Sequence, residues 1–285
     1  MSDLTWDRLG AIAPHDLVSP TLELHWAAQY LASIGQTFAK PAEDDSHRAM
    51  SWDADLRAFV SAPMAGPYPF RAALRPTDTT LLLIDRTGAE LGALPLAGVR
   101  RDEGYEWLAT GLATYLGGAP PSIGRPDYDM PSHAVSSGAE AFSEPTAGPS
   151  LEALYDAAAD TLHQLANRRP DASDILCWPH HFDIATLLTV DDGSADGVTK
   201  TVGVGMAPMG GGYDTWYWYV TPYPYPAHER LGELSGPGRW HTEGWTGAVL
   251  QGSDVVAAPP EEREGLVRAF VDEAIESAVE ALRSD

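Results

Sequence analysis

Apolar residues recur every three or four positions along several stretches of the chain, and this spacing predicts helices. The first predicted helix runs from about Pro20 to Ala39 after a capping Ser19, with an apolar stripe of Leu24, Ala27, Leu31, Ile34 and Phe38. Two more are predicted over about 102–116 and 150–167. A last one starts at Pro259-Pro260, and its stripe consists of Val267, Phe270, Ala274, Ala278 and Leu282.

Strands are predicted between these helices, because the intervening segments are apolar and bounded by turn residues. In the first half they are Trp52–Val60, Tyr68–Leu74, Thr79–Asp85 and Glu90–Leu96; in the second half they are Ile175–Val190, Thr199–Ala207, Thr215–Val220 and Trp245–Leu250. Turns at 86–88, 191–193 and 210–212 favour antiparallel neighbours. The predicted fold class is α+β, with two similar helix–antiparallel-sheet–helix halves whose sheets are covered by helices.

Residues 117–150 interrupt both patterns, since 22 of these 34 residues are Gly, Pro, Ser or Ala. We therefore predict a first half at 1–116, a linker at 117–150 and a second half at 151–285. The halves begin with similar strings, Ser19-Pro20-Thr21-Leu22-Glu23 and Gly148-Pro149-Ser150-Leu151-Glu152. This similarity favours an internal pseudo-repeat, and the alternative is a general α+β habit without duplication.

Charge narrows the classes of partner. The 18 Lys+Arg and 41 Asp+Glu residues give 18 − 41 = −23, a charge that disfavours both nucleic acid and an anionic membrane surface. Only two basic residues are lysines, Lys40 and Lys200, which suggests a salt-rich cytoplasm. A GC-rich genome is the alternative explanation. The single cysteine, Cys177, and an N-terminus without a leader pattern also predict a cytoplasmic protein.

The string from Cys177 to Ala185 contains the first candidate site. On a strand, His181 and Asp183 would share one face, as a catalytic imidazole and its orienting carboxylate or as two ligands of a divalent metal. His25, the pair His241 and Glu243, and the pair His228-Glu229 are candidates for further ligands. The spacing matches no diagnostic metal motif, and the alternative is a His–Asp hydrogen bond that anchors the sheet.

The aromatic string from Tyr213 to Tyr225 is the second candidate. If it is extended, Trp216 and Trp218 share one face, and Tyr217 and Tyr219 share the other. Such faces can stack on a sugar or another planar ligand, and they can equally fill a two-layer core.

Three strings together resemble a bacterial family of uncharacterised proteins. They are Leu24-His25-Trp26-Ala27-Ala28-Gln29, Trp178-Pro179-His180-His181-Phe182-Asp183-Ile184-Ala185 and Tyr217-Trp218-Tyr219-Val220-Thr221-Pro222-Tyr223-Pro224. That family pairs an L-H-x-W-like helix with an F-D-[LI]-A strand and an aromatic–proline strand. The resemblance implies no activity. Its pattern includes Phe182, Asp183 and Ala185 but not His180 or His181, which favours Asp183 as the functional residue.

Two functions follow from these patterns. The first is a small-molecule-binding protein that uses metal-assisted hydrolysis, with His181 and Asp183 as catalytic or metal-binding residues. Its ligand-binding residues would be His25, Trp216, Trp218 and His241, in a pocket between the halves. The alternative is a structural or protein-interaction protein without an active site.

Overall fold

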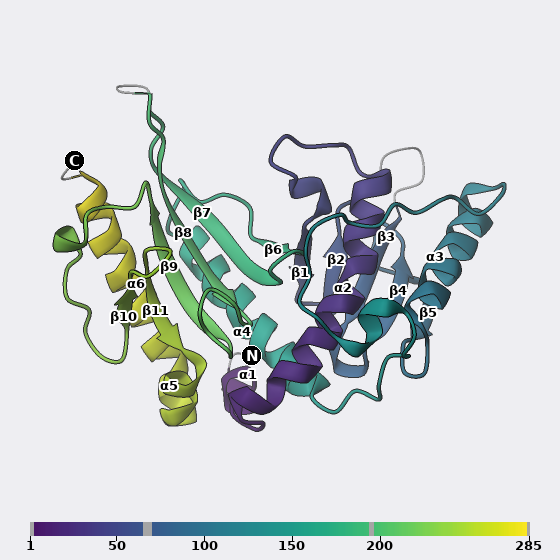
Figure 1. Cartoon of the computed structure of the whole chain (residues 1–285), viewed down its shortest axis with the longest axis horizontal. Coiled ribbons are helices and arrows are strands. Elements are labelled where there is room, and N and C mark those ends of the chain that lie inside the picture. Colours follow the sequence, from purple (N-terminus) through teal and green to yellow (C-terminus); the bar gives the residue numbers. More distant parts are fainter. Residues whose placement is uncertain (1–2, 65–69, 194–196, 284–285) are drawn as a thin grey trace. The chain divides into compact units, whose positions relative to one another are not determined.

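The computed structural model describes residues 3–64, 70–193 and 197–283, and it divides into two compact units. We call the first the α2 unit; it consists of Ser19–Glu152 and Leu176–Phe182. The second, the α6 unit, consists of Met1–Val18, Ala153–Ile175 and Asp183–Asp285. Each unit combines helices with antiparallel strands (Figure 1), so the predicted α+β class is confirmed.

Among its described residues, the α2 unit contains six strands and two long helices. The strand order is β6 (Leu176–Trp178), β1 (Met50–Asp53), β2 (Ala58–Ser61), β3 (Arg71–Arg75), β4 (Thr80–Ile84) and β5 (Glu90–Pro95). Its helices are α2 (Val18–Phe38) and α3 (Arg101–Leu116). Short 3-10 turns occur at Ser46–Arg48, Pro76–Asp78 and Ala134–Ser137.

Small residues bring the helices of the α2 unit close to their neighbours. Gly104 of α3 lies against the ring of Tyr30 on α2, where a side chain would collide with the Tyr30 hydroxyl. Gly111 of α3 faces Leu83 of β4, and Gly92 of β5 faces the ring of Trp107. These contacts pack α3 against both α2 and the strands.

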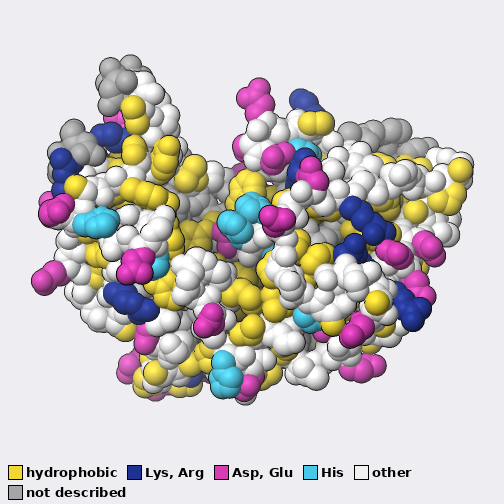
Figure 2. All heavy atoms as spheres, in the orientation of Figure 1, with side chains coloured by type: hydrophobic (Ala, Val, Ile, Leu, Met, Phe, Trp, Pro, Cys, Tyr) yellow, Lys and Arg dark blue, Asp and Glu magenta, His cyan; other side chains and the backbone are white. Residues whose placement is uncertain are grey.

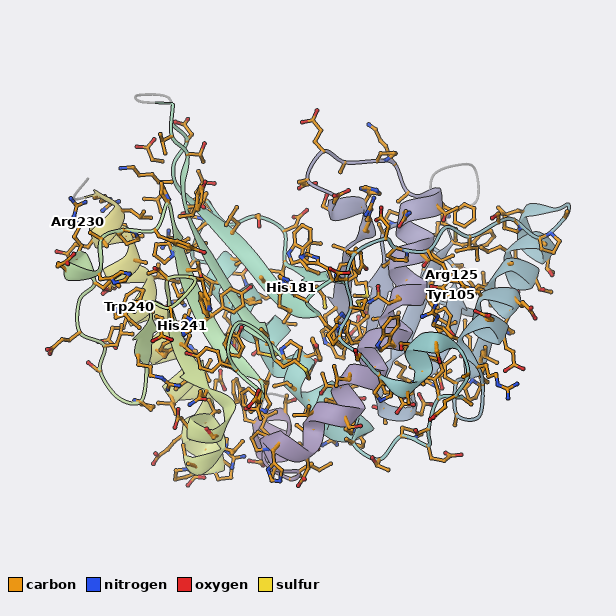
Figure 3. The ribbon with its side chains drawn as sticks, viewed as in Figure 1. Tyr105, Arg125, His181, Arg230, Trp240 and His241 are labelled. Carbon is orange, nitrogen blue, oxygen red and sulfur yellow. The ribbon has the colours of Figure 1, made fainter. Side chains whose placement is uncertain are left out.

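Segment 117–150 is attached to α2 and α3 by side-chain contacts. The Gly124 amide donates to Thr37 Oγ1 at 2.9 Å, and Trp26 Nε1 donates to the Pro131 carbonyl at 3.0 Å. The Arg125 guanidinium lies 4.6 Å from the Tyr105 ring centroid, and both residues are labelled in Figure 3. The role of this segment as a linker stays a prediction.

In the described part of the α6 unit, five strands follow the order β10 (Arg239–His241), β11 (Gly247–Gln251), β9 (Tyr217–Tyr223), β8 (Lys200–Ala207) and β7 (Asp183–Asp191). Its helices are α1 (Asp3–Arg8), α5 (Gly252–Ala257), α6 (Pro260–Arg283) and most of α4 (Gly148–Ala166), with 3-10 turns at Pro14–Leu17 and His228–Arg230. Helix α6 packs on β8, β9 and β11.

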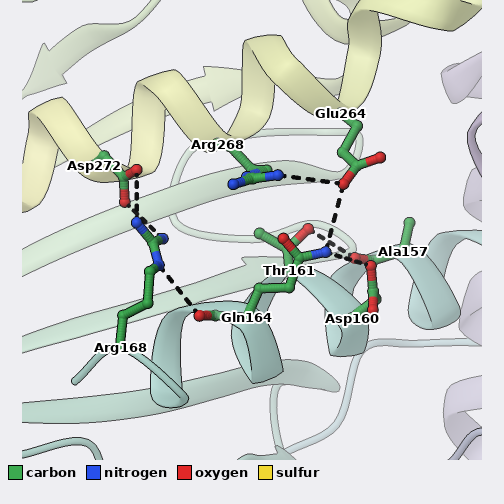
Figure 4. A network of polar contacts seen from close by, with 8 residues as sticks. All are labelled: Ala157, Asp160, Thr161, Gln164, Arg168, Glu264, Arg268 and Asp272. Carbon is green, nitrogen blue, oxygen red and sulfur yellow. Dashed lines mark hydrogen bonds and ion pairs between the residues drawn. The ribbon is translucent and has the colours of Figure 1, made fainter. Parts of the chain in front are cut away.

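Charged residues connect α4 with α6 (Figure 4). Arg168 forms a paired interaction with Asp272, at 3.1 and 3.0 Å, and Gln164 Nε2 donates to Glu264 Oε1 at 3.4 Å. Arg268 lies 3.7 Å from the same Glu264 carboxylate. Because the pairs are partly exposed, each contributes little to the stability of the fold.

The predicted helices are confirmed, and the apolar stripe of α6 is buried throughout. Two predicted strands are wrong because a turn divides each of them. Residues 54–57, with Arg57 in the left-handed region (φ 50°), separate β1 from β2. Residues 179–182 separate β6 from β7. The start of the predicted strand Tyr68–Leu74 lies outside the described residues, and the sequence missed α1, α5 and β10.

The distribution of charged side chains on the surface (Figure 2) agrees with the net charge of −23. On the face shown in Figure 2, acidic side chains are spread widely and basic ones are fewer. No helix in the described ranges is long and apolar enough to cross a membrane.

Candidate functional site

The turn at 179–182 in the α2 unit is fastened to α2. The Pro179 carbonyl accepts hydrogen bonds from His25 Nε2 at 2.8 Å and from Gln29 Nε2 at 2.9 Å. The His25 ring also stacks on Phe182, with centroids 5.0 Å apart and planes 3° apart. Since a carbonyl can only accept, Nε2 must be the protonated nitrogen of the neutral His25 ring.

Burial determines the protonation of His25. The side chain is 4% exposed, and desolvation lowers its pKa from 6.5 to about 4, although the hydrogen bond to Pro179 opposes the shift. The neighbouring His181 and His180 lower this pKa further. His25 is therefore neutral near pH 7, where it acts as a hydrogen-bond donor and not as a charged ligand contact.

Tyr128, which belongs to segment 117–150, contacts both α2 and the 179–182 turn. Its hydroxyl donates to Gln29 Oε1 at 2.5 Å, and its ring meets the His180 ring edge-on at 5.9 Å. The contacts link α2, the 179–182 turn and segment 117–150. Together they hold the 179–182 turn against α2.

His181 and Asp183 do not share a strand face, so that prediction is wrong. Pro179 and the left-handed Phe182 (φ 60°) interrupt the strand, which leaves His181 exposed in the turn (Figure 3) and Asp183 buried at the start of β7. Among the described residues, no group of three His, Cys, Asp or Glu side chains could hold a metal ion. Zinc sites use three or four protein ligands, and the described residues hold no such group, so the metal-binding role of His181 and Asp183 stays a prediction.

Asp183 takes part in a contact across three strands of the α6 unit. Tyr219 of β9 donates its hydroxyl to Asp183 Oδ2 of β7 at 2.5 Å. Strand β8 lies between them, and its Gly205 pairs with Ala185 on one side and Tyr219 on the other. A Cβ at Gly205 would come within 2.7 Å of the Tyr219 hydroxyl. Only glycine therefore leaves room for this hydrogen bond.

Beside Tyr219 lies an aromatic cluster, which we define as Tyr213, Tyr217, His241 and Trp245. Tyr213 and Tyr217 have centroids 4.6 Å apart, and His241 stacks on Trp245 at 4.5 Å with planes 30° apart. The Tyr213 hydroxyl lies 3.2 Å from His241 Nδ1, and Trp245 Nε1 donates to the Gly211 carbonyl at 2.9 Å. Burial, with help from Asp183 and Tyr213, raises the pKa of Tyr217 to about 12.

A pocket of about 530 Å³ adjoins this cluster at Trp245. Two rings, Tyr225 and Trp245, contribute large apolar surfaces to its wall. The remaining lining is mostly small or polar and consists of Pro226, Ala227, His228, Glu229, Thr242, Gly244 and Thr246. All of these residues belong to the α6 unit.

A second pocket, of about 580 Å³, lies against α6. Its lining contains two arginines and two glutamates, together with Ile275 and Val279. Its lining contains no aromatic side chain, and its two positive charges balance its two negative ones. It therefore offers fewer groups that could orient a small molecule than the pocket at Trp245 does.

The structure brings only part of the predicted site together. Trp216 and Trp218 are 3% and 1% exposed, so both indoles belong to the core of the α6 unit. His241 does lie in the aromatic cluster, whereas His25 belongs to the α2 unit. Tyr225 lay in the predicted aromatic string without being singled out as a ligand-binding residue, and sequence reasoning missed Trp245. The repeated Tyr-Pro dipeptides at 223–226 were the available signal for Tyr225.

Comparisons with known proteins add no relative. Scans of protein-family models, of curated proteins and of solved structures each gave no match.

Proposed function

We propose that the α6 unit binds a small organic molecule in the pocket at Trp245. The observation that carries this proposal is the lining, which combines the Tyr225 and Trp245 rings with Glu229, His228 and Thr242 around about 530 Å³. Small-molecule sites have volumes of roughly 300–1,000 Å³, with apolar or aromatic walls and a few polar groups that set orientation. The pocket at Trp245 falls in this range of volume and supplies two aromatic rings, and the rest of its wall is mostly small or polar.

The fixed position of Trp245 supports the proposal. Its indole N–H is bonded to Gly211, and its ring is stacked on His241, whose own Nε2 lies 2.7 Å from the Glu243 carbonyl. A ring that is already ordered loses less conformational entropy when a ligand binds.

Ligand-observed NMR with a fragment library tests this function on the full chain. Fragments that receive saturation from the wild-type protein are expected to lose most of that signal with Tyr225→Ala. Tyr223→Ala is the matched control, because Tyr223 is another exposed tyrosine before a proline and does not line the pocket. If every fragment signal survives both Tyr225→Ala and Trp245→Ala, this function is refuted.

A structural role is the second candidate, and the cluster at His25 favours it for the α2 unit. His25, Gln29 and Tyr128 bond to one another or to the turn, and together they fasten β6 and its turn to α2. On this proposal, His25→Ala loosens the 179–182 turn. Hydrogen exchange at the turn amides measures that effect, and unchanged protection would contradict it.

Cytoplasmic location, the lack of nucleic-acid partners and the two matched halves also remain proposals. The charge of −23 supports the first two, because self-repulsion on this scale suits a salt-rich interior and repels phosphate. Fractionation of cells that express the tagged chain tests the location. Filter binding to duplex DNA tests the partner class.

A further inference from the structure

We infer that the pocket at Trp245 takes an organic cation, such as a quaternary or alkylated ammonium compound. This inference rests on the proposed function, because it names the class of ligand for the same pocket. Three observations support it: the charge of the lining, the chemistry of its rings and the behaviour of a nearby arginine.

The lining has a negative formal charge. Glu229 is its only Asp or Glu, and neither lysine nor arginine occurs among the nine lining residues. Arg230 follows Glu229 in the chain but does not line the pocket, and Figure 3 shows it apart from His241. An anionic ligand would meet the Glu229 carboxylate here, whereas a cation would gain from it.

The two rings add an attraction that is specific for cations. Trp gives the strongest cation–π interaction among the aromatic side chains, followed by Tyr, because the negative face of each ring attracts positive charge. Tyr225 is 51% exposed and so presents its ring to solvent. Quaternary ammonium groups suit such sites, because they carry a diffuse charge and cost little to desolvate compared with a primary ammonium.

The neighbouring aromatic cluster already attracts a cation from the chain itself. The Arg239 guanidinium lies 5.7 Å from the centroid of Tyr213, which in turn contacts His241 and Tyr217. One positive charge of the chain therefore already lies over a ring of this cluster. The pocket at Trp245 continues the cluster without an arginine of its own.

Calorimetric titration of the full chain with choline chloride tests the class of ligand. The comparison ligand is the neutral carbon analogue of choline, in which a tert-butyl group replaces the trimethylammonium group, and glucose represents neutral polyols. Ionic strength is kept constant with NaCl. We expect choline to bind about tenfold more tightly than its neutral analogue, since the shape is shared and only the charge differs.

Glu229→Gln isolates the carboxylate without changing its size. We expect it to reduce choline affinity by about fivefold and to leave the neutral analogue unaffected. Glu106→Gln is the control, because Glu106 is an exposed glutamate on α3 of the other unit and its loss changes the net charge equally.

The outcomes separate the two proposals. If the neutral analogue or glucose binds as tightly as choline and depends on Tyr225, the cation class is refuted and the binding function stands. If Glu229→Gln keeps the full preference for choline, the cation class stands and the role of the Glu229 carboxylate is refuted. If nothing in the choline titration or the fragment screen depends on Tyr225 or Trp245, the binding function itself fails.

Discussion

Lowering the pH from 7 to 4 is expected to destabilise the protein through His25, and His25→Gln is expected to remove that part of the loss. The pKa of His25 is about 4 in the folded chain and 6.5 as the ordinary value. Between these values the unfolded chain binds a proton that the folded chain does not. The free energy of unfolding therefore falls as the pH falls through this window and is fully retained above it.

The size of the effect follows from the difference between the two pKa values. Each pKa unit corresponds to about 1.4 kcal/mol, so His25 accounts for about 3 kcal/mol of lost stability near pH 4. That is a large share of the roughly 5–15 kcal/mol by which domains are stable. Glutamine is the chosen replacement, because its amide can donate to the Pro179 carbonyl that His25 Nε2 contacts at 2.8 Å but does not titrate.

Urea unfolding followed by circular dichroism at pH 7, 5.5 and 4 measures the effect. Wild type should lose about 3 kcal/mol more than His25→Gln over this range, because carboxylates contribute equally to both proteins. His15→Gln is the control, since the His15 side chain is 77% exposed, and it should follow wild type. Equal losses in wild type and His25→Gln would refute the argument that burial holds this ring neutral.

Three further predictions concern stability. Gly35→Ala should lower the melting temperature, because the alanine Cβ would collide with the His47 carbonyl. This loss should outweigh the roughly 1 kcal/mol by which alanine normally favours a helix over glycine. Gly265→Ala is the control: it has open space around it and should raise stability by about 0.5–1 kcal/mol. Arg263→Leu should lower the free energy of unfolding, measured with urea, by about 3 kcal/mol. The reason is that the buried Arg263 guanidinium donates to the carbonyls of Trp6, Leu9, Val256 and Ala258. Arg268 is exposed, so Arg268→Leu should change this free energy by no more than about 0.5 kcal/mol. The melting temperature should rise from low to molar KCl as salt screens the charge of −23, and a flat or falling curve would contradict a salt-adapted surface.

Helices could be predicted from the sequence because their evidence is local. The α6 stripe repeats at helical spacing over its whole length, and every member is buried. Strands were less predictable where a turn lacks glycine. Residues 54–57 contain neither glycine nor proline, yet Arg57 adopts a left-handed conformation that separates β1 from β2. The residue types in this turn do not by themselves predict a left-handed backbone conformation.

The candidate site was harder to predict because its contacts join distant parts of the chain. His25 and Pro179 are 154 residues apart, and no spacing rule connects them. The hydrogen bond from Tyr219 to Asp183 depends on Gly205 of the strand between them, so it required the strand order as well as the residues. Asp183 was identified as a candidate from its string, but its partner could be identified only from the register.

The acidic surface and the pocket at Trp245 should affect cation binding in different ways. Surface charges attract a cation from a distance, but salt limits this attraction to about 10 Å at 0.1 M and about 3 Å at 1 M. Glu229, Tyr225 and Trp245 line the pocket itself, so their interaction with a ligand acts at contact distance. Raising KCl to molar strength should therefore slow association and weaken choline binding, while the preference over the neutral analogue persists in part. If that preference disappears completely in molar salt, the charge of −23 explains it and the rings of the pocket do not.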